Sequence, residues 1–343
     1  MVFNTQNSIW NYWIHNGLIK RLWNYLLSVF PGIFGFVLIF GLKILIPTNT
    51  KWLAHGANTD PIQAYLGWQF FRGSESGIPL GSNPNYGLLD SNTIVYSDSI
   101  PLVAILLKPF DKFLPEQFQY LGIWILLCFL LQSYLATKIV LIFTNDKTTA
   151  LLTSFILVFT PAFVARANLH FALASHFVIL FAIYFAIKST INDSNIDLKW
   201  SLLLVSTSLI HAYLLVIVFV IYLSDVARRG FKKGISKRKL FFRFLLTSVT
   251  LVISMFLIAG YKAGEPKGLL TNHWGIYRWN LLSFFNPRGW SYILNSTISR
   301  ESNFETFVYV GLANLVLFLL CLFISIKKRL ALLEIVKRYK FLI

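Results

Sequence analysis

The stretch "WSLLLVSTSLIHAYLLVIVFVIYL", residues 200–223, decides how this chain is arranged, because it is either one membrane crossing or a hairpin. Dense basic clusters lie at residues 228–239 and 327–340. If every apolar run crossed once, starting from cytoplasmic Lys20 and Arg21, both clusters would lie outside. Cytoplasmic segments are the ones enriched in Lys and Arg. We therefore predict a hairpin of two short half-helices, which places every dense basic cluster in the cytoplasm.

The composition indicates a helical membrane protein. Hydrophobic residues make up 56% of the 343 residues and charged residues only 13%, whereas soluble domains carry about 25% charged residues. Several apolar runs reach the roughly 20 residues needed to cross a bilayer. The predicted fold class is all-α, a polytopic transmembrane bundle forming one transmembrane domain over residues 1–343. The other predicted crossings lie at about residues 25–47, 118–143, 148–164, 171–188, 241–261 and 305–326.

The formal charge of +17 is compatible with nucleic-acid binding or with an anionic membrane surface. The basic residues cluster beside apolar runs, which is the pattern that membrane topology and anionic lipids favour. We expect anionic membrane lipids as partners and no nucleic acid. The chain stops abruptly at "YKFLI", which fits a natural end or a fragment lacking a C-terminal part.

The predicted topology places two long loops, at about residues 48–117 and 262–304, on the outer face together with the short loop "ARANLH". It also places His211 and Tyr213 at the tip of the hairpin, deep in the protein. Broken helices at membrane depth are tolerated only where protein or a wet cavity surrounds them. The hairpin therefore predicts a cavity at its tip.

The first outer loop contains "NTDPIQAYLGWQFFRG", which reads as the start of a short amphipathic helix. Thr59 or Asp60 fits a helix cap, and Pro61 fits the first helical turn. Such a helix lies flat in the membrane interface. The residues expected on its apolar stripe are Leu66, Phe70 and Phe71.

A second acid, Asp98, lies between two serines before the apolar run "IPLVAILL". Both Asp60 and Asp98 have a purely structural explanation as helix caps. The functional alternative is that both flank a loop dense in Gly, Asn, Tyr and Trp, which suits a sugar, near a membrane surface that presents lipid-linked head groups. The sequence leaves both explanations open.

An acid just after the first crossing, in an outer loop with interfacial helices, resembles the GT-C superfamily of membrane glycosyltransferases. The motifs "NTDPIQAYLGWQFFR", "PLGSNPNYG", "SDSIPL" and "RWNLLSFFNPRG" also resemble a bacterial family of multi-pass membrane proteins without an assigned activity, over residues 53–312. The GT-C resemblance implies an inverting enzyme that moves a sugar from a polyprenyl-phosphate donor to a glycan or lipid acceptor. It implies the bacterial cytoplasmic membrane, with the active face periplasmic or extracellular.

By this resemblance Asp60 is the general base and Asp98 a second polar or metal-binding acid. The sequence assigns no metal ligand set and no definite cofactor, and it leaves a divalent metal open. The sequence departs from many GT-C enzymes in having Pro61 after a single acid and no soluble outer domain at the C-terminus. These departures leave the acceptor class open.

Other residues are candidates for binding the substrate or its phosphate, because cations and aromatic residues suit phosphates and sugars. Arg166 has the alternative of a snorkelling side chain, His170 that of a hydrogen-bonded histidine near the pocket, and His211 that of a satisfied core histidine. Arg278 and Arg288, like His273, lie in the second outer loop, where an interfacial aromatic belt is the alternative. The full set is Arg72, Arg166, His170, His211, Tyr213, His273, Arg278 and Arg288.

Two further classes of function compete with the enzyme. A transporter or flippase for a lipid-linked envelope intermediate needs the same cavity but no base, and usually shows paired repeats. No such repeat is visible in the sequence. A non-catalytic partner in envelope polysaccharide synthesis is the third class. The sequence shows no nucleotide-binding motif, which argues against a cytoplasmic nucleotide-sugar donor.

Overall fold

The computed structural model describes residues 5–54, 60–86, 92–191, 196–232, 236–261, 281–296 and 307–328, and residues 333, 334 and 337 of the basic tail. These residues form an all-α fold, as predicted, with one antiparallel pair of two-residue strands, β1 (Ser82–Asn83) and β2 (Asn92–Thr93). The long helices are α1 (Thr5–Phe40), α4 (Leu121–Phe143), α5 (Lys147–Val158), α7 (Phe177–Ile191), α8 (Asp197–Ser208), α9 (Ala212–Phe231), α10 (Lys237–Ile253) and α11 (Leu312–Lys327).

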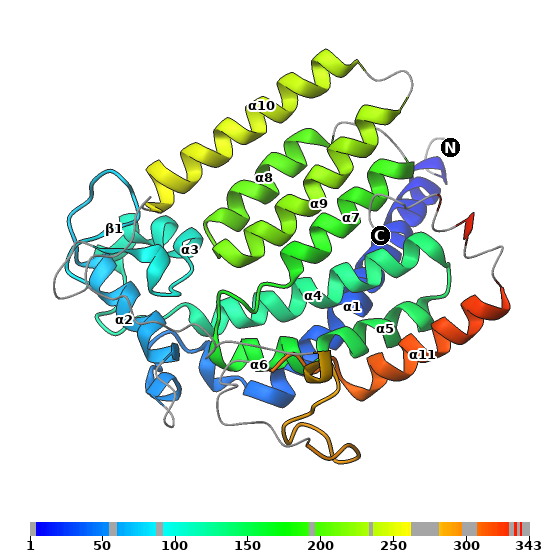
Figure 1. The fold of residues 1–343 in the computed structure, drawn as a ribbon, viewed down its shortest axis with the longest axis horizontal. Helices are drawn as coiled ribbons and strands as arrows, with labels where there is room; N and C mark the ends of the chain where they lie inside the picture. Colours follow the sequence, from blue (N-terminus) through cyan, green and yellow to red (C-terminus); the bar gives the residue numbers. More distant parts are fainter. Residues whose placement is uncertain are drawn as a thin grey trace.

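The helices pack as a bundle with a compact cap at one end (Figure 1). Helices α7, α8, α9 and α10 lie side by side, α4 packs on α7, and α1 and α5 pack on α4. The cap contains α2 (Asp60–Arg72), α3 (Pro101–Leu107) and the two strands. Short 3₁₀ segments connect these parts, at Lys43–Leu45, Lys51–Ala54, Ile94–Tyr96, Lys108–Phe113 and Leu281–Phe284.

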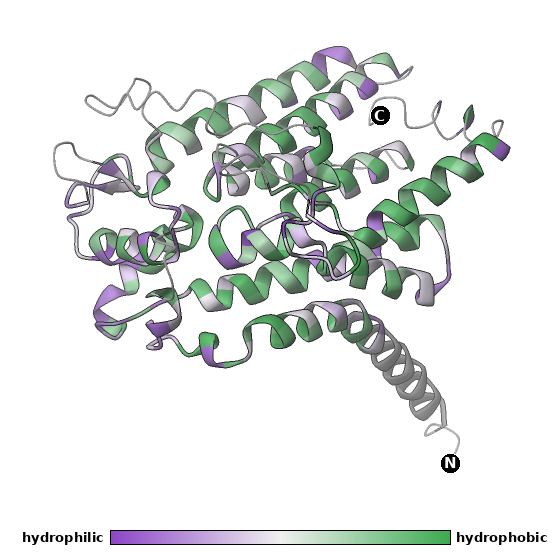
Figure 2. Ribbon diagram, turned by 60° about the horizontal axis from the view of Figure 1, so that its bottom comes forward, coloured by the Kyte–Doolittle hydropathy of each residue, from purple (hydrophilic) through white to green (hydrophobic). Residues whose placement is uncertain are grey.

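Three described helical stretches are long and apolar enough to cross a membrane: Leu22–Phe40, Leu121–Phe143 and Lys237–Ala259. A fourth span results if α5 and α6 (Pro161–Leu169), which are bent by 47°, count as one broken crossing. Figure 2 shows hydrophobic residues along the bundle helices and hydrophilic residues mainly in connecting segments. This pattern agrees with the prediction of a membrane protein.

The predicted crossing at 148–164 and the predicted loop "ARANLH" are wrong in detail. Helix α5 ends at Val158, and a new helix, α6, begins at Pro161 and includes most of that loop. Proline cannot donate the hydrogen bond that would continue α5, but it fits the first turn of a helix. The next helix, α7, starts only at Phe177, six residues later than predicted.

Residues 200–223 lie within two antiparallel helices, α8 and α9, joined by a turn at 209–211. The arms extend beyond the predicted range, because α8 starts at Asp197 and α9 continues to Phe231. The extension carries Asp197, Asp225, Arg228 and Arg229 into the helices, where they form ion pairs. The hairpin therefore reaches the cap with its tip and the basic end of the bundle with its base.

A buried ionic network joins the helices at the base of the hairpin. The Asp225 carboxylate, whose side chain is 0% exposed, pairs with Arg228 at 3.1 Å and with Arg229 at 3.2 Å. It also accepts hydrogen bonds from Ser189 of α7 and Trp200 of α8. Asp197 bridges Arg229 to Arg243 of α10, at 2.5 and 2.7 Å. The network therefore connects α7, α8, α9 and α10.

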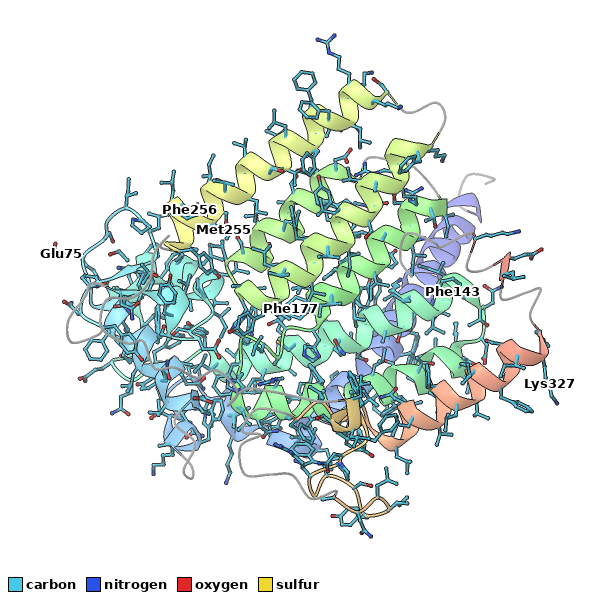
Figure 3. The ribbon with its side chains drawn as sticks, viewed as in Figure 1. Glu75, Phe143, Phe177, Met255, Phe256 and Lys327 are labelled. Atoms are coloured by element: carbon cyan, nitrogen blue, oxygen red, sulfur yellow. The ribbon has the colours of Figure 1, made fainter. Side chains whose placement is uncertain are left out.

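The two ends of the bundle are visible in Figure 3. Glu75 of the cap lies at one end, and Met255 and Phe256 lie at the end of α10 that is next to the cap. Phe143, the last residue of α4, and Lys327, the last of α11, lie at the other end. Helix α10 closes with a π-helical segment, Ser254–Ala259, at the cap end.

The cap packs against that π-helical segment through backbone hydrogen bonds. The N–H groups of Leu80 and Gly81 donate to the carbonyls of Leu257 and Ile258, at 3.1 and 2.7 Å. A Cβ added at Gly81 would lie 2.2 Å from the Ala259 carbonyl oxygen, so the approach requires glycine. The irregular helix end leaves carbonyls unpaired within the helix, and the cap uses them.

We predict that Asp225→Asn lowers the melting temperature of the purified protein, because it removes the buried carboxylate that pairs with Arg228 and Arg229 and leaves Asp197 as the carboxylate partner of Arg229. Removing one partner of a buried ion pair costs about 3–5 kcal/mol. Thermal unfolding in detergent measures the effect, and Glu75→Gln, which removes an exposed carboxylate, is the control. Equal melting temperatures for the two variants would contradict the prediction.

Candidate active site

Four ionisable side chains from separate segments meet where the cap covers the hairpin tip. They are Asp60 at the start of α2, Asp98 before α3, His170 after α6 and His211 at the tip. His170 Nδ1 lies 3.6 Å from Asp60 Oδ2 and 4.0 Å from Asp98 Oδ2. His211 Nε2 lies 3.7 Å from Asp98 Oδ1. We refer to these four residues as the acid–histidine cluster; their functional roles stay predictions.

Asp60 is the first residue of α2, directly before Pro61. A carboxylate in the first helical turn is favoured by the positive end of the helix dipole. The alternative cap, Thr59, lies outside the described residues. The Asp60 side chain is 38% exposed, against 20% for Asp98. Asp60 is therefore the carboxylate of the cluster that a substrate reaches more readily.

The predicted apolar stripe of α2 is divided between the protein interior and the surface. Phe71 is buried, but Leu66 and Phe70 are exposed by 41% and 44%. The buried face of the helix consists of Pro61, Ala64, Gly67, Trp68 and Phe71. The spacing of three and four residues is helical, but the small residues Ala64 and Gly67 define the face because the cap packs against them.

Asp98 lies in a tight turn that two buried serines hold in place. Ser97 and Ser99 hydrogen bond to each other at 2.8 Å, and the Ser99 hydroxyl donates to the Ala64 carbonyl of α2 at 2.6 Å. The Tyr120 hydroxyl donates to the Ser99 carbonyl. The turn is anchored to α2 and to the residue before α4, so the position of Asp98 is fixed.

The backbone of this turn is strained. Asp98 has a φ of 57° and Ile100, which is fully buried, a φ of 48°. Aspartate tolerates this left-handed region, but a β-branched residue there is an outlier that costs about 1–3 kcal/mol. The interpretation of Asp98 as a helix cap is wrong, because Ile100 is the N-cap of α3 and no side chain caps that helix.

Gly67 allows α2 to approach the Asp98 turn. A Cβ at this position would lie 2.2 Å from Ser97 Oγ and 2.4 Å from Ser99 Oγ. No side chain larger than hydrogen fits without moving the turn. The sequence alone does not reveal this role, because a glycine within a helix has no local signature for a partner 30 residues away.

His211 is held in one tautomer by the start of α9. Its Nδ1 accepts the N–H of Tyr213 at 3.1 Å, so in the neutral ring the proton is on Nε2, which faces Asp98. The turn is fixed further by the Leu102 N–H, which donates to the Leu209 carbonyl at 2.7 Å. The first bond is internal to the hairpin tip, and the second attaches the tip to the segment that follows Asp98.

The electrostatic environment separates the protonation states of Asp98 and His211. Burial raises the pKa of Asp98 to about 6, with the Asp60 charge adding to the shift and Arg166 opposing it. Burial lowers the pKa of His211 to about 4, with His170 and Arg166 contributing. Near neutral pH the pair is therefore a carboxylate facing a neutral imidazole. Arg166, in the last turn of α6, is close enough to act on both groups.

The remaining predicted site residues are not members of this cluster. Arg72 is at the far end of α2, where it pairs with Asp111 and donates to the Pro115 carbonyl at 2.9 Å, so its role is to hold the segment before α4. The Tyr213 ring meets the His211 ring edge to face, with the ring centroids 4.9 Å apart, and Tyr213 is 71% exposed. Arg288 lies in the loop 281–296. His273 and Arg278 lie outside the described residues.

Within the described part of the chain, no group of three or more His, Cys, Asp or Glu side chains is arranged to hold a metal ion. The two acids and two histidines approach one another in pairs at 3.6–4.0 Å. Side chains at this separation tighten into hydrogen bonds when a substrate organises them. The arrangement suits proton transfer between a substrate hydroxyl and a carboxylate.

A family model described as a domain of unknown function (DUF6311) matches residues 29–343. The match covers the bundle, the cap and all four residues of the acid–histidine cluster. No curated protein matches the chain, and no solved structure matches it.

We predict that a carboxylic acid of the wild-type protein titrates with a midpoint near pH 6 and that Asp98→Asn removes this titration. Infrared spectroscopy of the protonated carboxyl band measures it. The folded-state pKa lies above the ordinary value of 3.8, so stability from Asp98 is present at low pH and lost as the pH rises through 6. Asp98→Asn should therefore melt higher than wild type at about pH 8. An unchanged band in Asp98→Asn would contradict the assignment.

We predict that Gly67→Ala destabilises the protein by about 1–3 kcal/mol, the usual cost of overpacking, because its methyl group collides with the Asp98 turn. Gly73→Ala is the matched control, since a Cβ there meets nothing closer than 3.8 Å. Thermal unfolding compares the two variants. The same loss of stability in both would mean that the turn yields easily.

Proposed function

This chain belongs to the DUF6311 family, and we propose that it is a GT-C-type membrane glycosyltransferase. In this proposal it transfers a sugar from a polyprenyl-phosphate donor to a hydroxyl of a glycan or lipid acceptor, with inversion. The membrane is the bacterial cytoplasmic membrane and the active face is the outer one. The observation that supports the proposal is the meeting of Asp60 and Asp98 at His170.

Asp60 is the proposed general base. As the acceptor oxygen forms its bond to the anomeric carbon, its proton passes to the Asp60 carboxylate, and the bond from that carbon to the donor phosphate oxygen breaks. The polyprenyl phosphate leaves with the electron pair. A base needs access to the acceptor, and Asp60 is the more exposed acid. A positioned base contributes about 10²–10⁴-fold to the rate.

Asp98 and the histidines have supporting roles in this mechanism. Ionised Asp98 lies near His170 and faces neutral His211, so it holds both rings in orientation. His170 Nδ1 lies near both carboxylates, and a ring N–H there is available to either acid.

Arg166 is the proposed contact for the donor phosphate. Charge-assisted bonds from arginine to phosphate are strong and directional, and charge developing on the leaving phosphate needs a fixed cation. Arg166 lies one helical turn before His170, so a phosphate beside it is close to the acids. Anionic lipids are expected at the basic end of the bundle, and no nucleic acid is required.

We predict that Asp60→Asn lowers transfer from a polyprenyl-phosphate-linked sugar by about 10²–10⁴-fold and leaves donor binding intact. The assay uses the full chain in lipid nanodiscs, radiolabelled donors carrying different sugars, and glycan or lipid acceptors. Glu116→Gln, which removes an exposed carboxylate of the same outer segment, should retain wild-type activity.

Two results would contradict the proposal. Full transfer by Asp60→Asn would remove the base from the mechanism. Movement of an intact lipid-linked sugar across the bilayer, without transfer and without dependence on Asp60, would instead identify a flippase.

A further inference from the structure

An apolar groove opens between the outer end of α5 and the start of α11. Its volume is about 490 Å³, within the range of about 300–1,000 Å³ typical of small-molecule sites. It lies at the opposite end of α6 from the acid–histidine cluster. We call it the α5–α11 groove; its lining includes Phe155, Phe159, Pro161, Ile293, Leu312 and Ala313.

The start of α11 packs closely against the start of α6 at the bottom of the groove. Gly311, with a φ of 90°, brings the start of α11 against Pro161, and a Cβ there would lie 2.9 Å from the proline ring. Asn314 also lines the groove, but its amide already donates to the Val310 carbonyl at 2.7 Å and to Thr160 Oγ1 at 3.3 Å. The apolar walls therefore meet at a rigid junction.

One polar group of this lining has no protein partner. Tyr309 lines the groove and is 1% exposed, and its hydroxyl makes no hydrogen bond with any described residue. A buried hydroxyl without a partner is unfavourable. The groove therefore suits a ligand that is mostly apolar and carries one hydrogen-bond acceptor oxygen next to the Tyr309 hydroxyl.

The surroundings indicate a membrane lipid. Helix α11 has no fully buried residue in its described length, and most of its apolar side chains beyond Leu315 are exposed, as they are where a helix faces hydrocarbon. An isoprenoid chain has no oxygen along its hydrocarbon length, whereas a glycerophospholipid has ester carbonyls where its acyl chains begin. We propose that the groove binds one acyl chain of a glycerophospholipid, whose ester carbonyl accepts a hydrogen bond from the Tyr309 hydroxyl.

This lipid site is independent of glycosyl transfer, because it is separated from the cluster by the length of α6. Nine residues at 1.5 Å per residue span about 13 Å. A bound lipid would contact Pro161 at the start of α6, whereas Arg166 lies in the last turn of the same helix. Lipid binding and glycosyl transfer can therefore be measured, and lost, separately.

Native mass spectrometry tests the proposal with the full chain, stripped of lipid in detergent and titrated with phosphatidylglycerol of defined acyl chains. We expect one tightly bound lipid for wild type and about tenfold weaker binding for Tyr309→Phe, which removes only the hydroxyl. Tyr292→Phe is the matched control: Tyr292 lines the same groove, but its side chain is fully exposed, so we expect no change.

A second variant fills the groove. Ala313→Trp should abolish the tight binding while the melting temperature stays at the wild-type value, because Ala313 is exposed. Unchanged lipid binding in both Tyr309→Phe and Ala313→Trp would overturn the proposal. Competitive displacement of the phospholipid by polyprenyl phosphate at lower concentration would also overturn it, and would assign the groove to the isoprenoid chain.

Discussion

The buried carboxylate of Asp225 is the interaction on which the position of the hairpin tip depends. It pairs with two arginines of α9 and accepts hydrogen bonds from α7 and α8. A shift of the hairpin base along its neighbours would therefore break these contacts and leave a buried charge without its partners. A buried ion pair is weak evidence for stability, and its best-attested role is to fix the register of the elements it joins. Helix α9 transmits that register to His211 at its other end, and the tip then meets Asp98.

The candidate site was accessible to sequence reasoning because of a property of membrane bundles. Apolar runs end on one of two faces, so polar residues at the ends of different runs gather on the same face. Asp60, His170 and His211 all follow or interrupt apolar runs, and the fold brings them to Asp98. Arg72 has the same type of position, but its partner Asp111 is 39 residues away, and nothing local distinguishes an arginine that holds a loop from one that holds a phosphate.

The positions where two backbone segments approach each other closely could not be predicted from the sequence. The glycines that admit neighbours, Gly67 against the Asp98 turn and Gly81 against the end of α10, differ from other glycines only in what lies opposite them. The π-helical end of α10 also has no local sequence signal, because it is stabilised by backbone N–H groups of the cap that donate to its carbonyls. The helices follow from composition and periodicity, whereas the cap that shapes the site follows from tertiary contacts.

The break between α5 and α6 brings His170 and Arg166 to the acid–histidine cluster. If the helix continued straight past Val158, its next turns would extend α5 along its own axis, with Arg166 and His170 beyond the end of the bundle. The bend of 47° turns α6 toward α2, with which it is in contact, and its last residues then reach Asp60. The proline that starts α6 also forms one wall of the α5–α11 groove. A single interruption of an apolar run therefore positions a cation and a histidine at one end of a short helix, and leaves an apolar recess at the other.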